Sequence, residues 1–322
     1  MIPLRDTVRA GHYPVANNVL IGINVLVFLF QLSLGAEGER FIYIFGLVPA
    51  RYTNPQISAY FSTPYQLFSF LSFMFLHGGF WHLLGNMWTL YIFGDNVEDR
   101  LGHLRYLVFY LVCGFASGVS HLLLNLNSTV PTIGASGAIA GVMGAYFLLY
   151  PHSKILTLIP IFFIPYFLEI PAYFFLGLWF ILQFISAAGS QAEAGGVAWW
   201  AHIGGFIFGM LCLKILLMLP APEAPDAVRR ATARRKTPHL QVIRPIGPGP
   251  DPHLYATIDI TSHEAVAGTY KLVNIPWGFN KRLFRVAVPA GVQEGNKLRL
   301  RGLGKQSTTG ERGDLYLKVQ IR

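Results

Sequence analysis

The chain has 322 residues, of which 53% are hydrophobic. Only 13% are charged, about half the usual fraction of a soluble protein, which excludes an ordinary soluble globular protein and predicts a membrane protein. The net charge of +9 belongs entirely to the last third: residues 1–219 hold eight basic and eight acidic side chains, whereas residues 220–322 hold 17 and eight. The two parts therefore differ in kind.

Six apolar runs follow one another in residues 1–219. Each approaches the roughly 20 residues that a helix needs to cross the hydrocarbon core of a bilayer. We therefore expect an all-α polytopic membrane domain with six transmembrane helices. The expected spans are Val19–Leu34, Gln66–Phe93, His103–Leu124, Ile133–Tyr150, Ile170–Ala187 and Val197–Leu219.

The segments between these runs differ in character. Residues 35–65 carry three prolines and four charged side chains, which predicts a long loop with short interfacial helices. Residues 151–169 combine apolar residues with three further prolines, which predicts a loop lying at the membrane interface. No small-residue cleavage site follows the first run, so we expect no cleavable signal peptide.

The basic residues predict the orientation, because cytoplasmic loops carry an excess of Lys and Arg. The N-terminal arm, the loop between the second and third runs, Lys154 and the tail would share one side, and the other side holds only Arg40 and Arg51. Six spans then leave both termini in the cytosol. We expect a multi-pass protein of a bacterial inner (plasma) membrane.

Beyond the last run the composition changes twice. Residues 220–250 contain seven prolines and a cluster of basic residues, which predicts an extended linker. The cluster either touches anionic lipid or is an ordinary flank of the last span. Residues 251–322 alternate apolar and polar residues between glycine turns, which predicts a small soluble antiparallel β domain. The expected domains are therefore residues 1–219, 220–250 and 251–322.

Polar side chains inside a span cost free energy, so each is a functional candidate. Ser136 has the most informative surroundings, because Pro131 and a short outward loop precede it and place it at a helix start. Backbone N–H groups there lack intrahelical partners and favour negative charge, so they could hold an oxyanion while the serine attacks a carbonyl. The candidates are His77, His82, Asn86, Ser117, Ser120, His121, Ser136, Gln183 and His202.

His202 is the matching base on the last span. Small residues follow both side chains at helical spacing: Gly137, Ala140, Gly141 and Gly144 after Ser136, and Gly205 and Gly209 after His202. Two such faces pack closely in membranes and would bring the serine oxygen to about 3 Å from a histidine nitrogen. We expect the helix packing alone to orient the imidazole. Taken singly, a serine among small residues is common at helix crossings, and a lone histidine can be a proton relay or a helix contact.

His82 and Asn86 stand one helical turn apart. Both can donate to an oxyanion, and the amide does so without carrying charge. No metal site is expected, because these residues have neither a His-Glu-x-x-His motif nor a carboxylate beside them. Cys113 and Cys212 lie in apolar runs and indicate neither a disulfide framework nor a metal site. We expect no cofactor and no nucleic-acid partner.

Four motifs, in this order, resemble those of the rhomboid family of intramembrane serine proteases. They are His77…His82-x-x-x-Asn86, Gly94-x-x-x-Glu98-x-x-x-Gly102, Gly134-Ala-Ser136-Gly137 and Ala201-His202-x-x-Gly205, within about residues 15–219. The resemblance implies a six-helix fold and a catalytic dyad of Ser136 and His202 without a third acid.

The resemblance also implies roles for residues around the dyad. Asn86, His82 and the Ser136 backbone N–H would form an oxyanion hole. Glu98 and Arg100 would be a structural pair bracing the cytosolic loop. The fifth span, with Trp179 and Phe180, would be the lateral gate through which the substrate enters.

The tail resembles the C-terminal peptide-binding β domain of DnaJ-type co-chaperones. The similar segments are Ile260–Thr269, Val288–Gly304 and Gly313–Tyr316. No His-Pro-Asp signature occurs in the chain, so recruitment of an Hsp70 ATPase is not implied. Binding of a peptide or chaperone by strand addition or an apolar groove is one alternative, and a structural cap or dimerisation module is the other.

We therefore expect an intramembrane serine protease. It would cleave transmembrane protein substrates near their outward end, within the lipid bilayer. The alternative is a non-proteolytic membrane adaptor that binds transmembrane segments for quality control, and the reactivity of Ser136 separates the two. A transporter is disfavoured, because the polar residues cluster at one depth.

Overall fold

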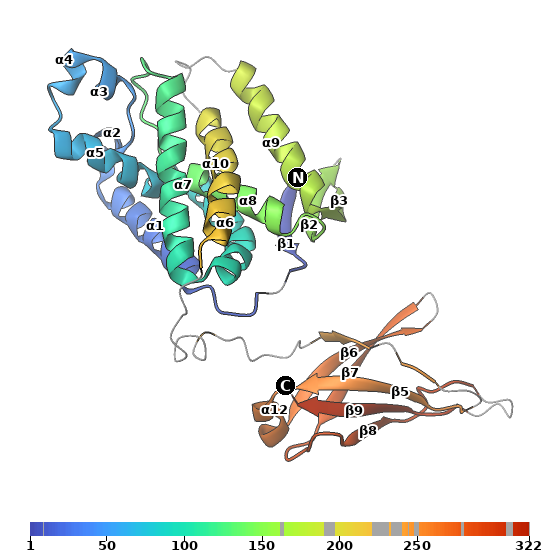
Figure 1. Cartoon of the computed structure of the whole chain (residues 1–322). Helices are drawn as coiled ribbons and strands as arrows, with labels where there is room; N and C mark the ends of the chain where they lie inside the picture. The colour runs from blue at the N-terminus through green and yellow to red at the C-terminus, as the bar shows by residue number, and fades with distance from the viewer. Residues whose placement is uncertain are drawn as a thin grey trace. The chain divides into compact units, whose positions relative to one another are not determined.

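The chain folds as two units, Met1–Ala233 and Arg234–Arg322, in the computed structural model (Figure 1). The structure describes residues 1–8, 10–161, 164–189, 197–220, 232, 240–243, 245–247, 251–277, 280–306 and 312–321. Most of the predicted linker, with its basic cluster, and residues 190–196 of an expected outward loop lie outside the described residues. The predicted division into three parts stays a prediction.

Among the described residues of the first unit, four helices are long and apolar enough to cross a membrane, as the composition predicts. They are α1 (Val15–Ser33), α7 (His103–Leu124), α9 (Ala172–Gly189) and α10 (Trp199–Met218). These helices correspond to the expected first, third, fifth and sixth spans. The first unit is therefore a helical membrane domain.

The second expected span, Gln66–Phe93, is not one straight helix. It consists of α5 (Thr63–Ser72) with the 3-10 turn Phe73–Phe75, followed by α6 (Phe80–Leu101) at an angle of 78°. Gly79 precedes α6 with an extended backbone, and glycine is a poor helix former, so the helix breaks here. Counted as one broken span, this pair raises the number of candidate spans to five.

The fourth expected span is too short to be a full crossing. Helix α8 (Ser136–Leu149) has 14 residues. At a rise of about 1.5 Å per residue it is about 21 Å long, whereas the hydrocarbon core is about 30 Å thick. The expectation of six spans is thus not confirmed: the described residues provide four to five candidate spans and one short apolar helix.

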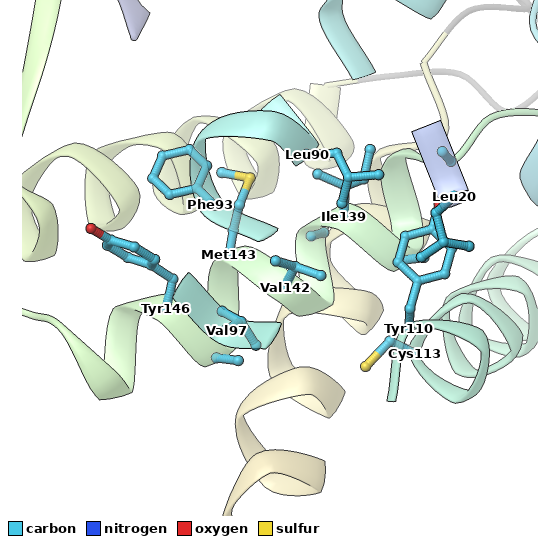
Figure 2. Close-up of a cluster of buried hydrophobic side chains, with 14 of the residues drawn as sticks. Leu20, Leu90, Phe93, Val97, Tyr110, Cys113, Ile139, Val142, Met143 and Tyr146 are labelled. Carbon is cyan, nitrogen blue, oxygen red and sulfur yellow. The ribbon is translucent and has the colours of Figure 1, made fainter. Parts of the chain in front are cut away.

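Helix α8 is the centre of the first unit. It packs against α6, α7 and α10, and all of its residues from Gly137 to Tyr146 are buried. A helix that is apolar on every face is buried in a protein core or in a membrane, and the contacts of α8 show that it lies in the core of the bundle. Figure 2 shows Ile139, Val142 and Met143 of α8 among side chains of the neighbouring helices; those labelled are Leu20, Leu90, Phe93, Val97, Tyr110 and Cys113.

The long loop after α1 contains short helices, as expected. Arg51 folds this loop onto itself: its buried guanidinium donates to the Ile44 carbonyl at 2.9 Å and lies 3.8 Å from the ring centre of Phe61. Burial lowers the pKa of Arg51 from its usual value. The elements are the 3-10 helix Gly35–Glu37, α2 (Gly38–Phe45), α3 (Ala50–Thr53) and α4 (Pro55–Ser58).

The segment 151–169 is a β-hairpin rather than an irregular loop. Strands β2 (Lys154–Ile161) and β3 (Ile164–Pro171) pair antiparallel, and β1 (Ile2–Asp6) from the N-terminal arm adds to β2. The β-branched residues among the prolines suit strands. A prediction based on proline breaks alone misses them, because prolines are tolerated at strand ends and edges.

The second unit contains two three-stranded sheets, β4-β6-β7 and β5-β9-β8. Their bounds are β4 (Leu240–Val242), β5 (Leu254–Ile260), β6 (Thr269–Trp277), β7 (Asn280–Val288), β8 (Lys297–Leu300) and β9 (Leu315–Ile321). The β class is as predicted, but the antiparallel assignment is wrong in part. The pairs β4–β6 and β5–β9 are parallel, a long-range arrangement that alternation within single strands does not specify.

One helix turns the chain between these sheets. Helix α12 (Ser262–Ala267) begins with a capping box, in which Thr261 and Glu264 each accept from the other's backbone N–H. Glu264 also binds the buried Lys271 ammonium of β6 at 2.6 Å. Ala265 and residues from both sheets form one apolar cluster, which includes Ile258, Val273, Val286 and Leu317.

Candidate active site

Ser136 is the first residue of α8. The backbone before it is held by two elements: Gly134 N–H donates to the Phe73 carbonyl at 2.9 Å, and Thr132 exchanges two hydrogen bonds with Leu47. Gly134 has a φ of +123°, in the left-handed region that favours glycine. The turn therefore places the Ser136 hydroxyl at a fixed point where the helix starts.

The Ser136 hydroxyl meets His202 of α10. The distance between Ser136 Oγ and His202 Nε2 is 2.7 Å, within hydrogen-bond range. Ser136 is half-buried and His202 is buried, so the pair lies at the wall of the helix bundle. The two residues are 66 positions apart in the chain, and the crossing of α8 and α10 joins them.

The other ring nitrogen of His202 also has a partner. His202 Nδ1 lies 2.7 Å from Gln183 Oε1, on α9. The expectation that helix packing alone orients the imidazole is therefore wrong. The sequence offered one signal for this contact, a glutamine within the fifth apolar run. Its partner could not be predicted, because it depends on how α9 is rotated about its own axis.

Glycines allow α8 and α10 to meet backbone to backbone. A Cβ on Gly205 would overlap the carbonyl of Gly137, and one on Gly209 would overlap the backbone of Gly141. The glycines of α8 also face α7: a Cβ on Gly141 would stand 2.6 Å from Cys113 Cβ. The close approach brings Ser136 within reach of His202.

His82 and Asn86, on the first two turns of α6, face the loop before Ser136. A Cβ built on Gly134 would stand 2.8 Å from His82 Nε2 and 3.6 Å from Asn86 Nδ2. Asn86 is buried, and its Nδ2 has no hydrogen-bond partner among the described residues. Two side-chain N–H donors can therefore serve a ligand beside Ser136.

A cavity of about 980 Å³ opens at this point. It is lined by Ser136, His202, His82 and Asn86 together with the loop before α8 and the start of α10. His121, another sequence candidate, lines it from α7. A group bound here would meet the hydroxyl, the imidazole and the unpartnered amide at once.

Trp179 and Phe180, the predicted gate residues, lie half-buried on α9 against α10. The Trp179 ring centre is 5.9 Å from that of His202 and 6.0 Å from that of Phe206. Phe180 is 4.9 Å from Phe206. These contacts place α9 directly against His202, and whether α9 opens stays a prediction.

Glu98 is buried, but its partners are not the expected ones. Its carboxylate accepts from the backbone N–H groups of Ala16 at 2.9 Å and Asn17 at 2.7 Å, and it pairs with His103. Arg100 is exposed, and no ion pair joins it to Glu98 in the part of the chain that the structure describes. Glu98 thus caps the start of α1, because those N–H groups lack intrahelical partners.

The described ranges contain no group of three or more His, Cys, Asp or Glu side chains that could hold a metal ion. Ser117 and Ser120, two further sequence candidates, donate to backbone carbonyls one turn earlier on α7. They pack against Gly137 and Gly204, which makes them helix contacts.

The fold and the cavity together define a multi-pass helical membrane protein that carries a small β domain. Residues 64–219 match the model of the Rhomboid domain, and residues 252–322 match that of the DnaJ C terminal domain. Both resemblances seen in the sequence are confirmed: the helical part is similar to the Rhomboid domain and the tail to the DnaJ C-terminal domain.

Curated relatives agree with this assignment. The mitochondrial Rhomboid protein 1 of Saccharomyces cerevisiae is 32% identical over 202 residues, which cover 60% of this chain and 50% of that protein. The mitochondrial RHOMBOID-like protein 6 of Arabidopsis thaliana is 33% identical over 150 residues, which cover 46% of this chain and 43% of that protein. A DnAJ-like protein of Synechocystis is 39% identical over 66 residues, 20% of this chain and 19% of its own length. The chain thus spans half or less of each of these relatives.

Proposed function

We propose that this protein is an intramembrane serine protease that cleaves peptide bonds in or next to transmembrane segments of membrane proteins. The observation that carries the proposal is the 2.7 Å distance between Ser136 Oγ and His202 Nε2, at a cavity in an apolar helix bundle. The rhomboid domain over residues 64–219 supports the same class of activity.

The proposed reaction has two stages, acylation and deacylation of Ser136, and His202 takes and returns a proton in each. His202 Nε2 takes the proton of the Ser136 hydroxyl as its oxygen attacks the scissile carbonyl, and the tetrahedral intermediate then expels the amine, which receives that proton. An acyl-enzyme on Ser136 remains. Water then attacks the acyl carbon as His202 takes one of its protons. His202 returns this proton to the Ser136 oxygen, and the carboxylic acid product leaves and ionises in water.

Asn86, His82 and the Ser136 backbone N–H are the proposed oxyanion donors. The support is the position of His82 and Asn86 on α6, where both side chains face the loop before Ser136, and the free Nδ2 of Asn86 among the described residues. Donors fixed in advance stabilise the developing negative charge without reorganising, and removing one typically costs about 10²–10³ in kcat.

Helix α9, with Trp179 and Phe180, is the proposed lateral gate. It packs on α10 mainly through aromatic side chains, and the outward-facing half of the helix is apolar and exposed. A substrate helix would enter from the lipid by displacing these aromatic contacts. Water would reach Ser136 through the cavity.

The domain limits and the orientation are further proposals. Residues 1–219 would form the membrane protease domain, residues 220–250 a linker and residues 251–322 a cytosolic β domain. The distribution of Lys and Arg supports termini on the cytosolic side. The relatives' names include mitochondrial proteins, so a bacterial inner membrane is one proposal for the location and a mitochondrial one is its competitor.

The proposed role of the C-terminal domain is binding of a peptide or chaperone. The match over residues 252–322 supports it. A structural cap or dimerisation module is the competing role, and a pull-down with unfolded model peptides separates the two.

The test of the protease proposal uses a co-expressed, tagged, single-span membrane protein. Ser136→Ala and His202→Ala should each abolish its cleavage, and Ser33→Ala, at an exposed position on α1, should leave cleavage unchanged. Cleavage by the Ser136→Ala protein would overturn the proposal.

The second candidate is a non-proteolytic adaptor that binds transmembrane segments. The same helix bundle could bind a span without cutting it. A fluorophosphonate probe decides between the two, because it labels only an activated serine. Absence of label on Ser136 in folded protein, together with binding of the span, would favour the adaptor.

A further inference from the structure

We propose that Gln183 is a positioning residue of this site, which fixes the tautomer of His202 that can act as a base. This inference rests on the proposed function and goes beyond the dyad. It starts from a single contact, the 2.7 Å between Gln183 Oε1 and His202 Nδ1.

The hydrogen-bond donors and acceptors decide which nitrogen carries the proton. An amide oxygen can only accept, so His202 Nδ1 must donate its N–H to Gln183 Oε1. A neutral imidazole carries one N–H, and Nε2 is then left with a lone pair directed at the Ser136 hydroxyl 2.7 Å away. The opposite tautomer would present an N–H to the serine and could not take its proton.

The surroundings keep this contact in place. The Gln183 side chain is 7% exposed, although it lies on a helix whose other residues largely face outward. Trp179, one turn earlier on the same face, has its ring centre 5.9 Å from that of His202, and Trp199 of α10 lies at 6.2 Å. The imidazole is therefore held by an amide at one nitrogen and by two indoles at its faces and edges.

The contact also strengthens during the reaction. When Nε2 takes the serine proton, His202 becomes an imidazolium and the Nδ1–H donor is charged. Hydrogen bonds from charged donors are shorter and roughly twice as strong as neutral ones. Gln183 thus stabilises the transition state more than the resting state, which is the condition for raising kcat. Gln183 itself gains and loses no proton.

Two substitutions show whether Gln183 acts by accepting a hydrogen bond from His202 or only by filling space. Gln183→Leu fills the site but can accept no hydrogen bond. Gln183→Glu, when ionised, can only accept. Ile185→Leu, two residues along α9 and 62% exposed, is the matched control.

The experiment measures the rate at which a fluorophosphonate labels Ser136 in the purified full-length protein in detergent, across pH. A small probe needs no gate, so the rate reports the activation of the serine. Gln183→Leu should label about 10²-fold more slowly, the lower end of what general-base assistance supplies. Gln183→Glu should stay within about threefold of the wild type. The pH at which the labelling rate of Gln183→Glu is half-maximal should rise, because a neighbouring carboxylate favours the imidazolium over the neutral base.

Cleavage of a single-span substrate gives the second readout. Gln183→Leu should lower kcat with little change in KM, the pattern of an interaction made in the transition state. Protein labelled with ¹⁵N-histidine gives the third: the His202 signal, identified by its loss in His202→Ala, should show a protonated Nδ1 in the wild type and a mixture in Gln183→Leu. The NMR arm remains decisive if Gln183→Leu loses stability, because the wild-type tautomer is read directly.

Wild-type labelling rates in Gln183→Leu would overturn the proposal, and so would an unprotonated Nδ1 in the wild type. A Gln183→Glu protein as slow as Gln183→Leu would also overturn it, since it would show that the amide donates or only fills space. These failures leave the protease proposal intact as long as Ser136→Ala abolishes cleavage. Cleavage by Ser136→Ala would remove the protease proposal itself.

Discussion

The carbonyl oxygen of Gly137 occupies the place where a Cβ on Gly205 would stand. Helices α8 and α10 are therefore in direct backbone contact, at the residue after Ser136 and one turn after His202. Close approach of this kind depends on residues without side chains and holds helices together through van der Waals packing. The geometry of the Ser136–His202 pair is a consequence of this contact.

The first prediction concerns this crossing. Gly205→Ala should push α10 away from α8, destabilise the protein by about 1–3 kcal/mol, as overpacking does, and reduce proteolysis at least tenfold with the dyad intact. Thermal unfolding and cleavage of a single-span substrate measure the two effects. Gly177→Ala on α9, where a Cβ would meet nothing within 4 Å, is the control and should be neutral. Full activity in Gly205→Ala would contradict the dependence on close packing.

The second prediction concerns the free amide of Asn86. Asn86→Ala should lower kcat by about 10²–10³ and leave KM within a few-fold, because an oxyanion donor acts mainly in the transition state. Steady-state kinetics on a single-span substrate measure it. Asn24→Ala on α1 is the control for loss of a buried amide, since Asn24 donates to its own helix and not to the cavity. Equal losses in both variants would point to a packing effect.

The third prediction concerns Glu98. Glu98→Gln should weaken the two hydrogen bonds that hold the start of α1, and Glu98→Ala should remove them. Hydrogen bonds to a charged group contribute about 1.5–3 kcal/mol each, so Glu98→Ala should markedly lower the melting temperature. Glu37→Gln, an exposed member of an i,i+3 pair, should change stability little. Measured at a temperature where both proteins are folded, Glu98→Ala should keep the fluorophosphonate reactivity of Ser136. Loss of that reactivity would show that Glu98 affects the reactivity of Ser136 and not only the stability of the fold.

The fourth prediction concerns the β domain. Glu264→Ala removes the acceptor for the Thr261 N–H and the carboxylate that binds the buried Lys271 ammonium. Because Glu264 is partly exposed, we expect a loss of about 2–4 kcal/mol, somewhat below the usual result of breaking a fully buried pair. Amide hydrogen exchange of the full-length protein should rise in β6 and α12 and remain unchanged in α8. Val266→Ala, at a 76% exposed position of the same helix, should leave exchange as in the wild type.

Several features follow from local pattern and were predictable from the sequence. Apolar length predicted α1, α7, α9 and α10, because a span must satisfy its own backbone hydrogen bonds in lipid. Alternation predicted that residues 251–322 form strands, and β5 to β9 lie there. Glycine spacing predicted that α8 and α10 approach closely, and the contact of Gly205 with Gly137 shows that they do.

Other features were mispredicted, and each miss has a physical cause. The sheet that contains the β2–β3 hairpin also includes β1, which pairs with β2 from about 150 residues away in the chain, and such long-range pairing leaves no local pattern. The break before α6 could not be predicted without the backbone conformation of Gly79, which is extended. Glu98 was paired with the neighbouring Arg100, whereas its buried carboxylate meets the N–H groups of α1.

The sequence by itself determined the two-part character of the chain, the apolar helices and the set of polar residues within them, because these depend on composition and on periodicity along a single element. Only the tertiary structure decided which of those polar residues meet. The rotation of α9 about its axis directs Gln183 toward His202, and the position of Ser136 as the first residue of α8 directs its hydroxyl toward the same imidazole ring. Helix rotations are set by side chains packing between elements, and such contacts join residues that no local pattern connects.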